Sequence, residues 1–112
     1  MTPPLELLQG TLDLLILHAL RAGPSHGYGI ASSIKDSSGA RLVVEDKALY
    51  VSLHRMEERG WVTSSWGVSD NNRRAKYYQL TGHGRKVLRQ KTSDWTAYVN
   101  AVFGVLNPAE AS

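Results

Sequence analysis

Apolar residues at helical spacing open the chain. Between Leu5 and Ala19 they recur at steps of three and four, which predicts a helix with one apolar face. We expect this helix to end at Gly23-Pro24, where both residues disfavour its continuation. The positions that form the apolar face are Leu5, Leu8, Leu12, Leu15, Ile16 and Ala19.

A second helix is expected to begin at Ser25 or His26. Ile30 and Ile34 are one helical turn apart and would point inward from it. Gly27 and Gly29 are poor helix formers, so we expect them to permit a close approach between helices.

A third helix follows a short apolar run. Leu42–Val44 predicts a minor strand, Asp46 is expected to cap the helix, and Gly60 is expected to end it. The inward side carries Leu49, Leu53 and Met56. The opposite side carries Lys47, Val51, His54 and Glu58, with Tyr50 and Glu57 at the edge.

Two segments rich in aromatic and β-branched residues predict a hairpin. These are Trp61–Trp66 and Ala75–Leu80, and Gly67–Asn72 supplies the turn between them. A helix that fits a major groove, followed by a cationic hairpin, is the layout of a winged helix-turn-helix. We therefore predict a mostly α fold with a small β-hairpin (α+β class).

The last helix, which Thr81 is expected to cap, carries a heptad pattern. Its apolar seam is widened by Tyr98 and Phe103, and is expected to pair with a second copy of the chain. The alternative is that it folds back on the first helix. The predicted dimer interface comprises Leu5, Leu8, Leu12, Leu88, Thr92, Trp95, Val99, Val102 and Leu106. Residues 1–81 would then bind DNA and residues 82–112 would form the dimerisation helix.

Composition adds two constraints. The chain has 112 residues, enough for one small domain, and no cysteine, which excludes a disulfide scaffold and fits a reducing cytoplasm. The apolar start from Leu5 to Leu20 is interrupted by charged and polar residues. We therefore expect no membrane span and no export signal.

Positive charge is concentrated in one segment. Arg41–Lys91 carries a net charge of +6, whereas the two flanks together carry −3. Such a concentration is expected of a surface that meets phosphate. The alternative is that these are ordinary solvated side chains.

Candidate DNA-binding residues come from three places. Lysine can donate to guanine and valine can touch a thymine methyl group, so the outer face of the third helix would read bases, unless it is only a solvated face. Cations in the hairpin would meet phosphate or a minor groove, unless the turn is merely solvated. The start of the second helix would meet phosphate, unless its side chains pack between helices. The candidates are Ser25, His26, Tyr28, Lys47, Tyr50, Val51, His54, Arg55, Asn72, Arg73, Arg74 and Lys76.

Other chemistry finds little support in the sequence. Trp95 and Tyr98 could hold a flat aromatic effector between subunits, although core packing is the alternative. The four histidines show no metal-ligand spacing, and no nucleophile elbow, phosphate loop or zinc-protease helix is present. We expect no metal, no cofactor and no catalytic residues.

Six segments, in order along the chain, resemble the PadR family of transcriptional regulators, specifically its short members with one C-terminal helix. They are Leu8–Leu17, His26–Ile30, Leu49–Glu57, Gly60–Val62, Asn72–Tyr78 and Leu80–Arg85. The resemblance implies a homodimeric winged-helix protein that binds a palindromic operator, usually as a repressor. It also implies dimerisation through the first and last helices, and in some members release of DNA by a small aromatic compound.

The chain departs from the family pattern at the third helix. Family members commonly have Gly-Ser before the Leu-Tyr pair and Pro-Ala after it, whereas this chain has Lys47-Ala48 and Val51-Ser52. Lys47 and Val51 change the face that is expected to meet the bases, so the operator of relatives should not be transferred to this chain. The leading hypothesis is a DNA-binding repressor; the alternative is a protein-interaction module on a winged-helix scaffold.

Overall fold

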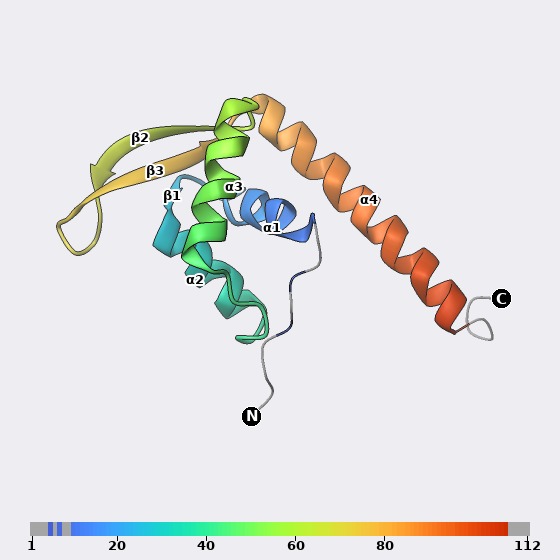
Figure 1. The fold of residues 1–112 in the computed structure, drawn as a ribbon. Helices are drawn as coiled ribbons and strands as arrows, with labels where there is room; N and C mark the ends of the chain where they lie inside the picture. The colour runs from blue at the N-terminus through green and yellow to red at the C-terminus, as the bar shows by residue number, and fades with distance from the viewer. Residues whose placement is uncertain (1–4, 6, 8–9, 108–112) are drawn as a thin grey trace.

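The computed structural model describes residues 5, 7 and 10–107, and has four helices with a small three-stranded sheet at one side of them (Figure 1). This confirms the predicted α+β class with a long C-terminal helix. The elements are α1 (Thr11–Ala19), β1 (Ser25–His26), α2 (Gly27–Ser37), α3 (Asp46–Glu58), β2 (Val62–Val68), β3 (Arg74–Leu80) and α4 (Gly82–Leu106).

The core lies where α1, α2 and α3 meet and where the inner ends of β2 and β3 cover them (Figure 1). α2 and α3 contribute the inward positions that their periodicity predicted, whereas in the first helical segment Leu17 and Leu20, which were not predicted, are buried beside the predicted Ile16. Several of the core side chains are completely buried. They include Ile16, Leu17, Leu20, Ile30, Leu53 and Met56. Burial of such apolar side chains is the main driving force that holds the three helices together.

The first helix is shorter than predicted. Gly10 has φ +85°, a left-handed conformation that interrupts a regular helix, and α1 starts only at Thr11. The backbone N–H of Leu5 donates to the carbonyl of Arg41 at 2.7 Å, so Leu5 lies against the loop before α3. The prediction of a helix from Leu5 was therefore wrong. Leu8 lies outside the described residues.

The sheet contains a strand that the sequence did not predict. Its order is β1-β3-β2, and Ser25 and His26 pair antiparallel with Tyr78 and Tyr77. Of the two predicted starts of the second helix, His26 is confirmed as the N-cap residue of α2, whereas Ser25 lies in β1 before the helix. The predicted strand at Leu42–Val44 is absent. That segment is a loop whose Leu42 and Val44 side chains pack against the core.

The two ends of α3 differ from each other in how they are stabilised. Glu45, not Asp46, is the N-cap residue and makes no side-chain capping bond, so the prediction for Asp46 was wrong. At the other end Gly60 has φ +77° and donates to the carbonyl of Glu57, while Trp61 donates to that of Met56. This pair of bonds is a Schellman motif, and it confirms Gly60 as the helix stop.

The hairpin, called the wing from here on, is longer than predicted. Val62–Val68 pairs with Arg74–Leu80 in continuous antiparallel register, so Gly67 belongs to a strand and not to the turn. The turn is Ser69–Arg73, closed by a 2.8 Å bond from the Ser69 N–H to the Arg73 carbonyl. The outer part of the wing extends away from the helices (Figure 1).

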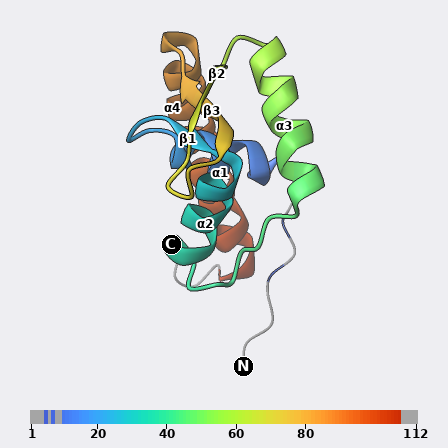
Figure 2. The same cartoon turned by 90° about the vertical axis from the view of Figure 1, so that its left-hand side faces the viewer.

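Helix α4 begins against the wing and ends away from the rest of the molecule. The Thr81 hydroxyl accepts from the Gly84 N–H at 2.9 Å, which confirms the predicted cap. Val87 and Leu88 pack against the core, whereas Val102 and Leu106 are exposed, and the outer half of α4 projects as an arm (Figures 1 and 2). No helix among the described residues is long and apolar enough to cross a membrane.

Candidate nucleic-acid interface

The outer face of α3 is open to solvent. Lys47 and His54 are exposed, and Tyr50 and Val51 are 50% and 56% exposed, respectively. Lys47, Val51 and His54 share one side of the helix because they are separated by three, four or seven positions, and Tyr50 lies at the edge of that side. An apolar side chain as exposed as Val51 adds nothing to the core, so this face has the size and chemistry to contact another molecule.

Tyr50 also fixes the distance between α3 and the start of α2. A Cβ atom at Gly27 would collide with the Tyr50 hydroxyl, so the absence of a side chain there lets the tyrosine lie across α2. The expected close approach of helices is thus found at Gly27. At Gly29 it is not, because a Cβ there would meet Ser25 Oγ and the His26 ring of the same segment.

Arg55 turns away from this face. Its Nη2 lies 2.6 Å and 2.7 Å from the two carboxylate oxygens of Asp13 on α1, and Asp13 is only 8% exposed. A guanidinium held by a buried carboxylate is engaged inside the domain. We therefore place Arg55 in the scaffold and leave it out of the set of residues that face outward.

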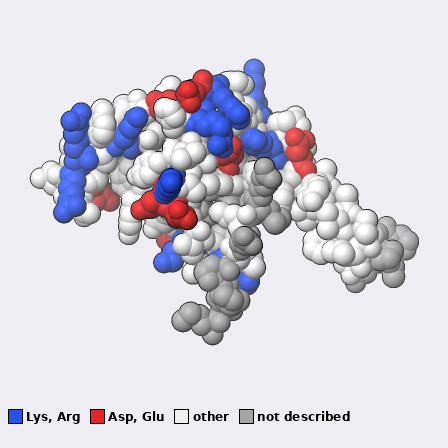
Figure 3. All heavy atoms as spheres, viewed as in Figure 1, with Lys and Arg blue, Asp and Glu red and all other residues white. Residues whose placement is uncertain are grey.

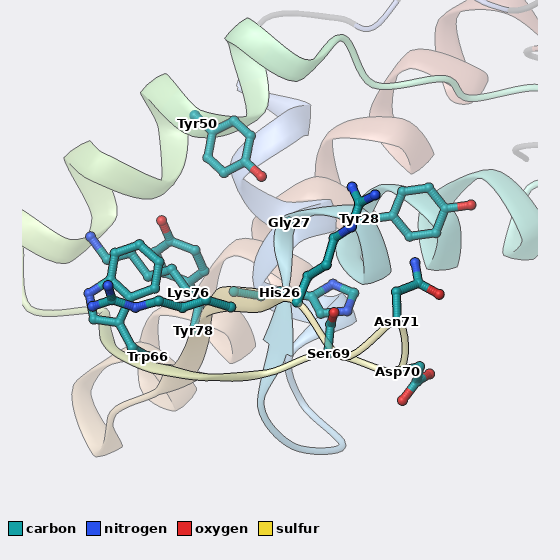
Figure 4. Close-up of a pocket in the computed structure, with 13 residues that line it drawn as sticks. His26, Gly27, Tyr28, Tyr50, Trp66, Ser69, Asp70, Asn71, Lys76 and Tyr78 are labelled. Atoms are coloured by element: carbon teal, nitrogen blue, oxygen red, sulfur yellow. The ribbon is translucent and has the colours of Figure 1, made fainter.

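A cleft of about 740 Å³ lies between α3, the start of α2 and the wing (Figure 4). Tyr50 enters it from α3, and Trp66, Lys76 and Tyr78 line the wing side. The cleft therefore combines aromatic rings with cations, a combination suited to nucleic acid. The remaining lining residues are His26, Gly27, Tyr28, Ser69, Asp70, Asn71, Arg73, Arg74 and Ala75.

Glu57 on α3 contacts two residues of the wing beside the cleft. Its carboxylate accepts a 2.5 Å hydrogen bond from Ser64 and lies 3.7 Å from the Lys76 ammonium group. Burial raises the pKa of the Tyr78 hydroxyl, and the nearby Glu57 and Tyr50 raise it further. Tyr78 is therefore a neutral hydrogen-bond donor at physiological pH, and Lys76 is partly neutralised by Glu57.

The tip of the wing carries the exposed cations. Asn72 has φ +58°, a conformation that asparagine tolerates in turns, and Arg73 and Arg74 follow it in exposed positions. Lys and Arg gather on the wing at the left of Figure 3 and near the junction of α3 with α4, while the outer half of α4 is mostly uncharged. The wing therefore carries the exposed cations of this surface, whereas α3 itself has three acidic and two basic side chains.

The predicted residues at the start of α2 have different environments. His26 Nδ1 accepts from the Gly29 N–H at 3.0 Å, so this backbone donor is already occupied. The His26 ring also lies 5.2 Å from the Tyr77 ring, which agrees with a packing role. Tyr28 is 80% exposed and lines the cleft together with His26. Tyr28 is therefore the residue of this segment most available to a ligand.

A second cavity lies between the start of α1 and the middle of α4. It has a volume of about 500 Å³ and is lined by Gly10, Thr11, Leu14, Lys91, Asp94, Trp95 and Tyr98. The Trp95 and Tyr98 rings stack with centroids 6.1 Å apart, so the two residues lie together on the wall of this cavity. The cavity offers an aromatic wall beside both a cation and a carboxylate.

The predicted dimer residues divide into two groups. Leu12 and Leu88 pack against the core of their own chain. The first turns of α4 therefore fold back within the same chain, as the alternative to the dimer seam expected. Leu5, Val102 and Leu106 are 53%, 38% and 67% exposed, while Trp95 and Val99 are half-buried and Thr92 is exposed.

Among the described residues, no group of three His, Asp or Glu side chains could hold a metal ion.

Trp66 is a residue that sequence reasoning missed. It is 60% exposed within the cleft, and the Arg74 guanidinium lies 4.3 Å from its ring centroid. The register of the hairpin carried the signal, because Trp66 pairs with Lys76 and therefore shares a face with the wing cations.

Known proteins with the same architecture identify the family. The model of the transcriptional regulator PadR-like family matches residues 16–90. A PadR family regulator structure from Eggerthella lenta is 31% identical, with TM-score 0.75, and the match covers 88% of this chain and 84% of that one. A transcriptional regulator structure from Clostridium thermocellum is 30% identical, with TM-score 0.76, covering 84% and 88% respectively.

A curated relative agrees with these matches. The negative transcriptional regulator PadR of Bacillus subtilis is 29% identical over 84 residues, which span 75% of this chain and 44% of that protein. Members of the family are DNA-binding transcriptional regulators and not enzymes, in agreement with the prediction from the sequence. The chain belongs to the PadR-like family of transcriptional regulators.

Proposed function

We propose that this regulator is a homodimeric repressor that acts in the cytoplasm on a palindromic operator. The observation that carries the proposal is the exposed face of α3 beside the cationic cleft of the wing. A helix of this kind fits the major groove, and a wing beside it reaches the backbone or the adjacent minor groove. Lys47, Val51 and His54 would meet base edges.

The backbone contacts come from the cleft and its rim. Arg73, Arg74, Lys76 and Asn72 meet phosphates or the minor groove from the wing, and Tyr50 and Tyr28 meet phosphate from the helices. Ser25 and His26 support the Tyr28 end of this surface. The Lys and Arg side chains on the wing support this orientation, because phosphate neutralisation supplies much of the affinity for DNA.

Two chains are proposed to pair through α4 and the residues before α1. Val99, Val102 and Leu106 form an apolar row along the outer half of α4, and Val102 and Leu106 have no core of their own chain to cover them. Leu5 adds exposed apolar surface near α1. A two-fold pair would present two α3 helices about one turn of DNA apart, which requires a palindromic site.

Repression and its relief form the last part of the proposal. The Bacillus subtilis relative is named a negative transcriptional regulator, which supports the repressor role. The 500 Å³ cavity beside Trp95 and Tyr98 supports a small aromatic effector, because a flat ring could stack there. An effector that binds more tightly to one spacing of the two α3 helices would shift the DNA affinity.

Selection of DNA fragments by the purified protein tests the DNA-binding part. We expect enriched fragments to share an inverted repeat with half-site centres about 10 base pairs apart. A footprint should cover both halves of this inverted repeat. A reporter gene under a promoter that contains the repeat should be more active when the protein is absent. Enrichment without any common motif, or a reporter that falls silent in its absence, would contradict the proposal.

Tryptophan fluorescence tests the effector part. The chain has three tryptophans, so Trp95→Phe is the matched control. An aromatic effector should quench the tryptophan emission of the wild-type protein, and this quenching should be absent in Trp95→Phe. The effector should also weaken binding of the wild-type protein to the selected operator. A broad panel of aromatic compounds that changes neither fluorescence nor DNA binding would refute the effector.

A further inference from the structure

The two neighbouring arginines of the wing are not equivalent. Arg74 stacks on Trp66, with the guanidinium carbon 4.3 Å from the ring centroid. Arg73 follows the turn, its carbonyl accepts from the Ser69 N–H, and no aromatic ring holds its guanidinium among the described residues. The sequence alone presents Arg73 and Arg74 as equals, whereas the fold supports only one of them.

Register explains why Trp66 and Arg74 meet. Trp66 lies directly opposite Lys76, and Val68 lies directly opposite Arg74, so all four side chains share one face of the hairpin. Arg74 is the diagonal neighbour of Trp66, within reach of a long side chain. This is also the face from which Ser64 contacts Glu57 of α3, so the stacked pair lies on the α3 side of the wing.

The neighbouring cation is engaged in a different way. Lys76 lies 3.7 Å from Glu57, which neutralises part of its charge, whereas Arg74 belongs to none of the ion pairs found in the described part of the chain. Trp66 itself is 60% exposed, so its ring does not stabilise the core. Arg74 is the cation that lies over its ring.

A stacked guanidinium keeps its hydrogen-bond donors available. When a guanidinium stacks on an indole, its flat face contacts the ring and its N–H groups, which lie in the guanidinium plane, remain free for a phosphate oxygen. Holding the side chain in one orientation also reduces the conformational entropy that is lost when it binds. We propose that Trp66 is a positioning residue that holds the Arg74 guanidinium ready to contact the DNA backbone.

This inference rests on the proposed function, and a double-mutant cycle tests it. Binding of one operator duplex is measured for wild type, Trp66→Leu, Arg74→Gln and the double variant. We expect Trp66→Leu to weaken binding by about two- to fivefold. It should have no effect when Arg74 is already glutamine. An equal loss in both backgrounds would mean that Trp66 contacts DNA itself and would overturn the proposal.

Two further variants guard against a general effect on the wing. Trp66→Phe keeps an aromatic face and should retain at least half of the wild-type affinity. Val68→Ala changes an equally exposed side chain directly opposite Arg74 and should leave the affinity unchanged. If Val68→Ala reduced the affinity as much as Trp66→Leu, the specific role of the indole would be refuted.

A measurement without DNA separates this inference from the proposed function. In the free protein, the ring current of Trp66 should shift the Arg74 side-chain proton resonances upfield, and Trp66→Leu should remove this shift. If wild type binds no duplex, the proposed function fails together with the inference. If wild type binds duplex but Trp66→Leu binds equally well, or the ring-current shift is absent, only the inference fails.

Discussion

Arg55 on α3 and Asp13 on α1 form an ion pair that ties the exposed helix to the scaffold. The arginine Nη2 contacts both carboxylate oxygens, at 2.6 Å and 2.7 Å, across 42 positions of sequence. Helix α1 also packs against α4. The ion pair therefore links α3, the proposed DNA-reading helix, through α1 to α4, the proposed dimerisation helix. Removing this ion pair should therefore lower the stability of the domain more than removing the charge of a solvent-exposed arginine would.

The first prediction concerns this pair. Asp13→Ala leaves the half-buried guanidinium without its partner and should lower the free energy of unfolding by about 1.5 kcal/mol. Partial exposure of Arg55 keeps the effect near the lower end of the range for charged hydrogen bonds. Urea denaturation measures it.

A double variant gives the control for the ion pair. Asp13→Ala combined with Arg55→Met should be no less stable than Asp13→Ala alone, because both halves of the pair are then gone. Arg55→Met should also leave the salt dependence of DNA binding unchanged. Strictly additive losses of stability, or a reduced salt slope, would contradict the placement of Arg55 in the scaffold.

The second prediction concerns the junction of the wing with α4. A Cβ atom at Gly84 would collide with the backbone carbonyl of Trp61, so Gly84→Ala must displace backbone and should cost about 1–3 kcal/mol of stability. A Cβ atom at Gly82, two residues earlier, would lie in open space, with no other atom within 4 Å. Thermal unfolding should show Gly82→Ala to be neutral or stabilising by up to about 1 kcal/mol. Equal effects at the two glycines would refute the close contact.

The third prediction concerns sequence recognition by α3. Lys47→Ala removes a donor expected at a base edge and should cost about 1–3 kcal/mol on the selected operator. Binding to unrelated duplex should weaken much less. Lys35→Gln removes the same charge from an exposed position on α2 outside the cleft, and is the matched control. If both variants lost affinity equally on both duplexes, Lys47 would contribute only general charge.

The fourth prediction concerns assembly. Val102→Glu combined with Leu106→Glu places two charges on the exposed apolar row of α4 and should convert the protein to a monomer in sedimentation equilibrium. Affinity for the palindromic operator should fall with it, because each half-site would bind independently.

Ala101→Glu provides the control for assembly. Ala101 is exposed on the opposite side of α4, so a charge there should leave the oligomeric state unchanged. A wild-type protein that is already monomeric at micromolar concentration, or a double variant that still dimerises, would contradict the proposed interface.

Local rules predicted the parts of this fold that depend on local sequence. Helix periodicity identified the inward residues of α2 and α3 but missed the buried Leu17 and Leu20. The stop at Gly60 and the cap at Thr81 follow from backbone geometry within a few residues. β1 escaped prediction because Ser25 and His26 have little intrinsic strand tendency and pair only because β3 offers them an edge. Leu42–Val44 has strand composition but packs against the core as a loop.

The site could be predicted only in outline. Helical geometry placed Lys47, Val51 and His54 on one open face, but it cannot reveal that Arg55 reaches back to a carboxylate 42 residues away. Likewise, the charge of the wing was visible in the sequence, whereas the stack of Arg74 on Trp66 depends on the hairpin register. Tertiary contacts therefore decide which of the cations face outward.

Binding of the selected operator and of a shuffled duplex of the same composition, measured across a range of salt concentrations, tests the central claim most directly. The account predicts at least about 10³-fold tighter binding to the operator at physiological salt. It also predicts a log–log salt slope that corresponds to several phosphate contacts for each dimer. Equal affinity for the two duplexes, or affinity that does not respond to salt, would contradict it.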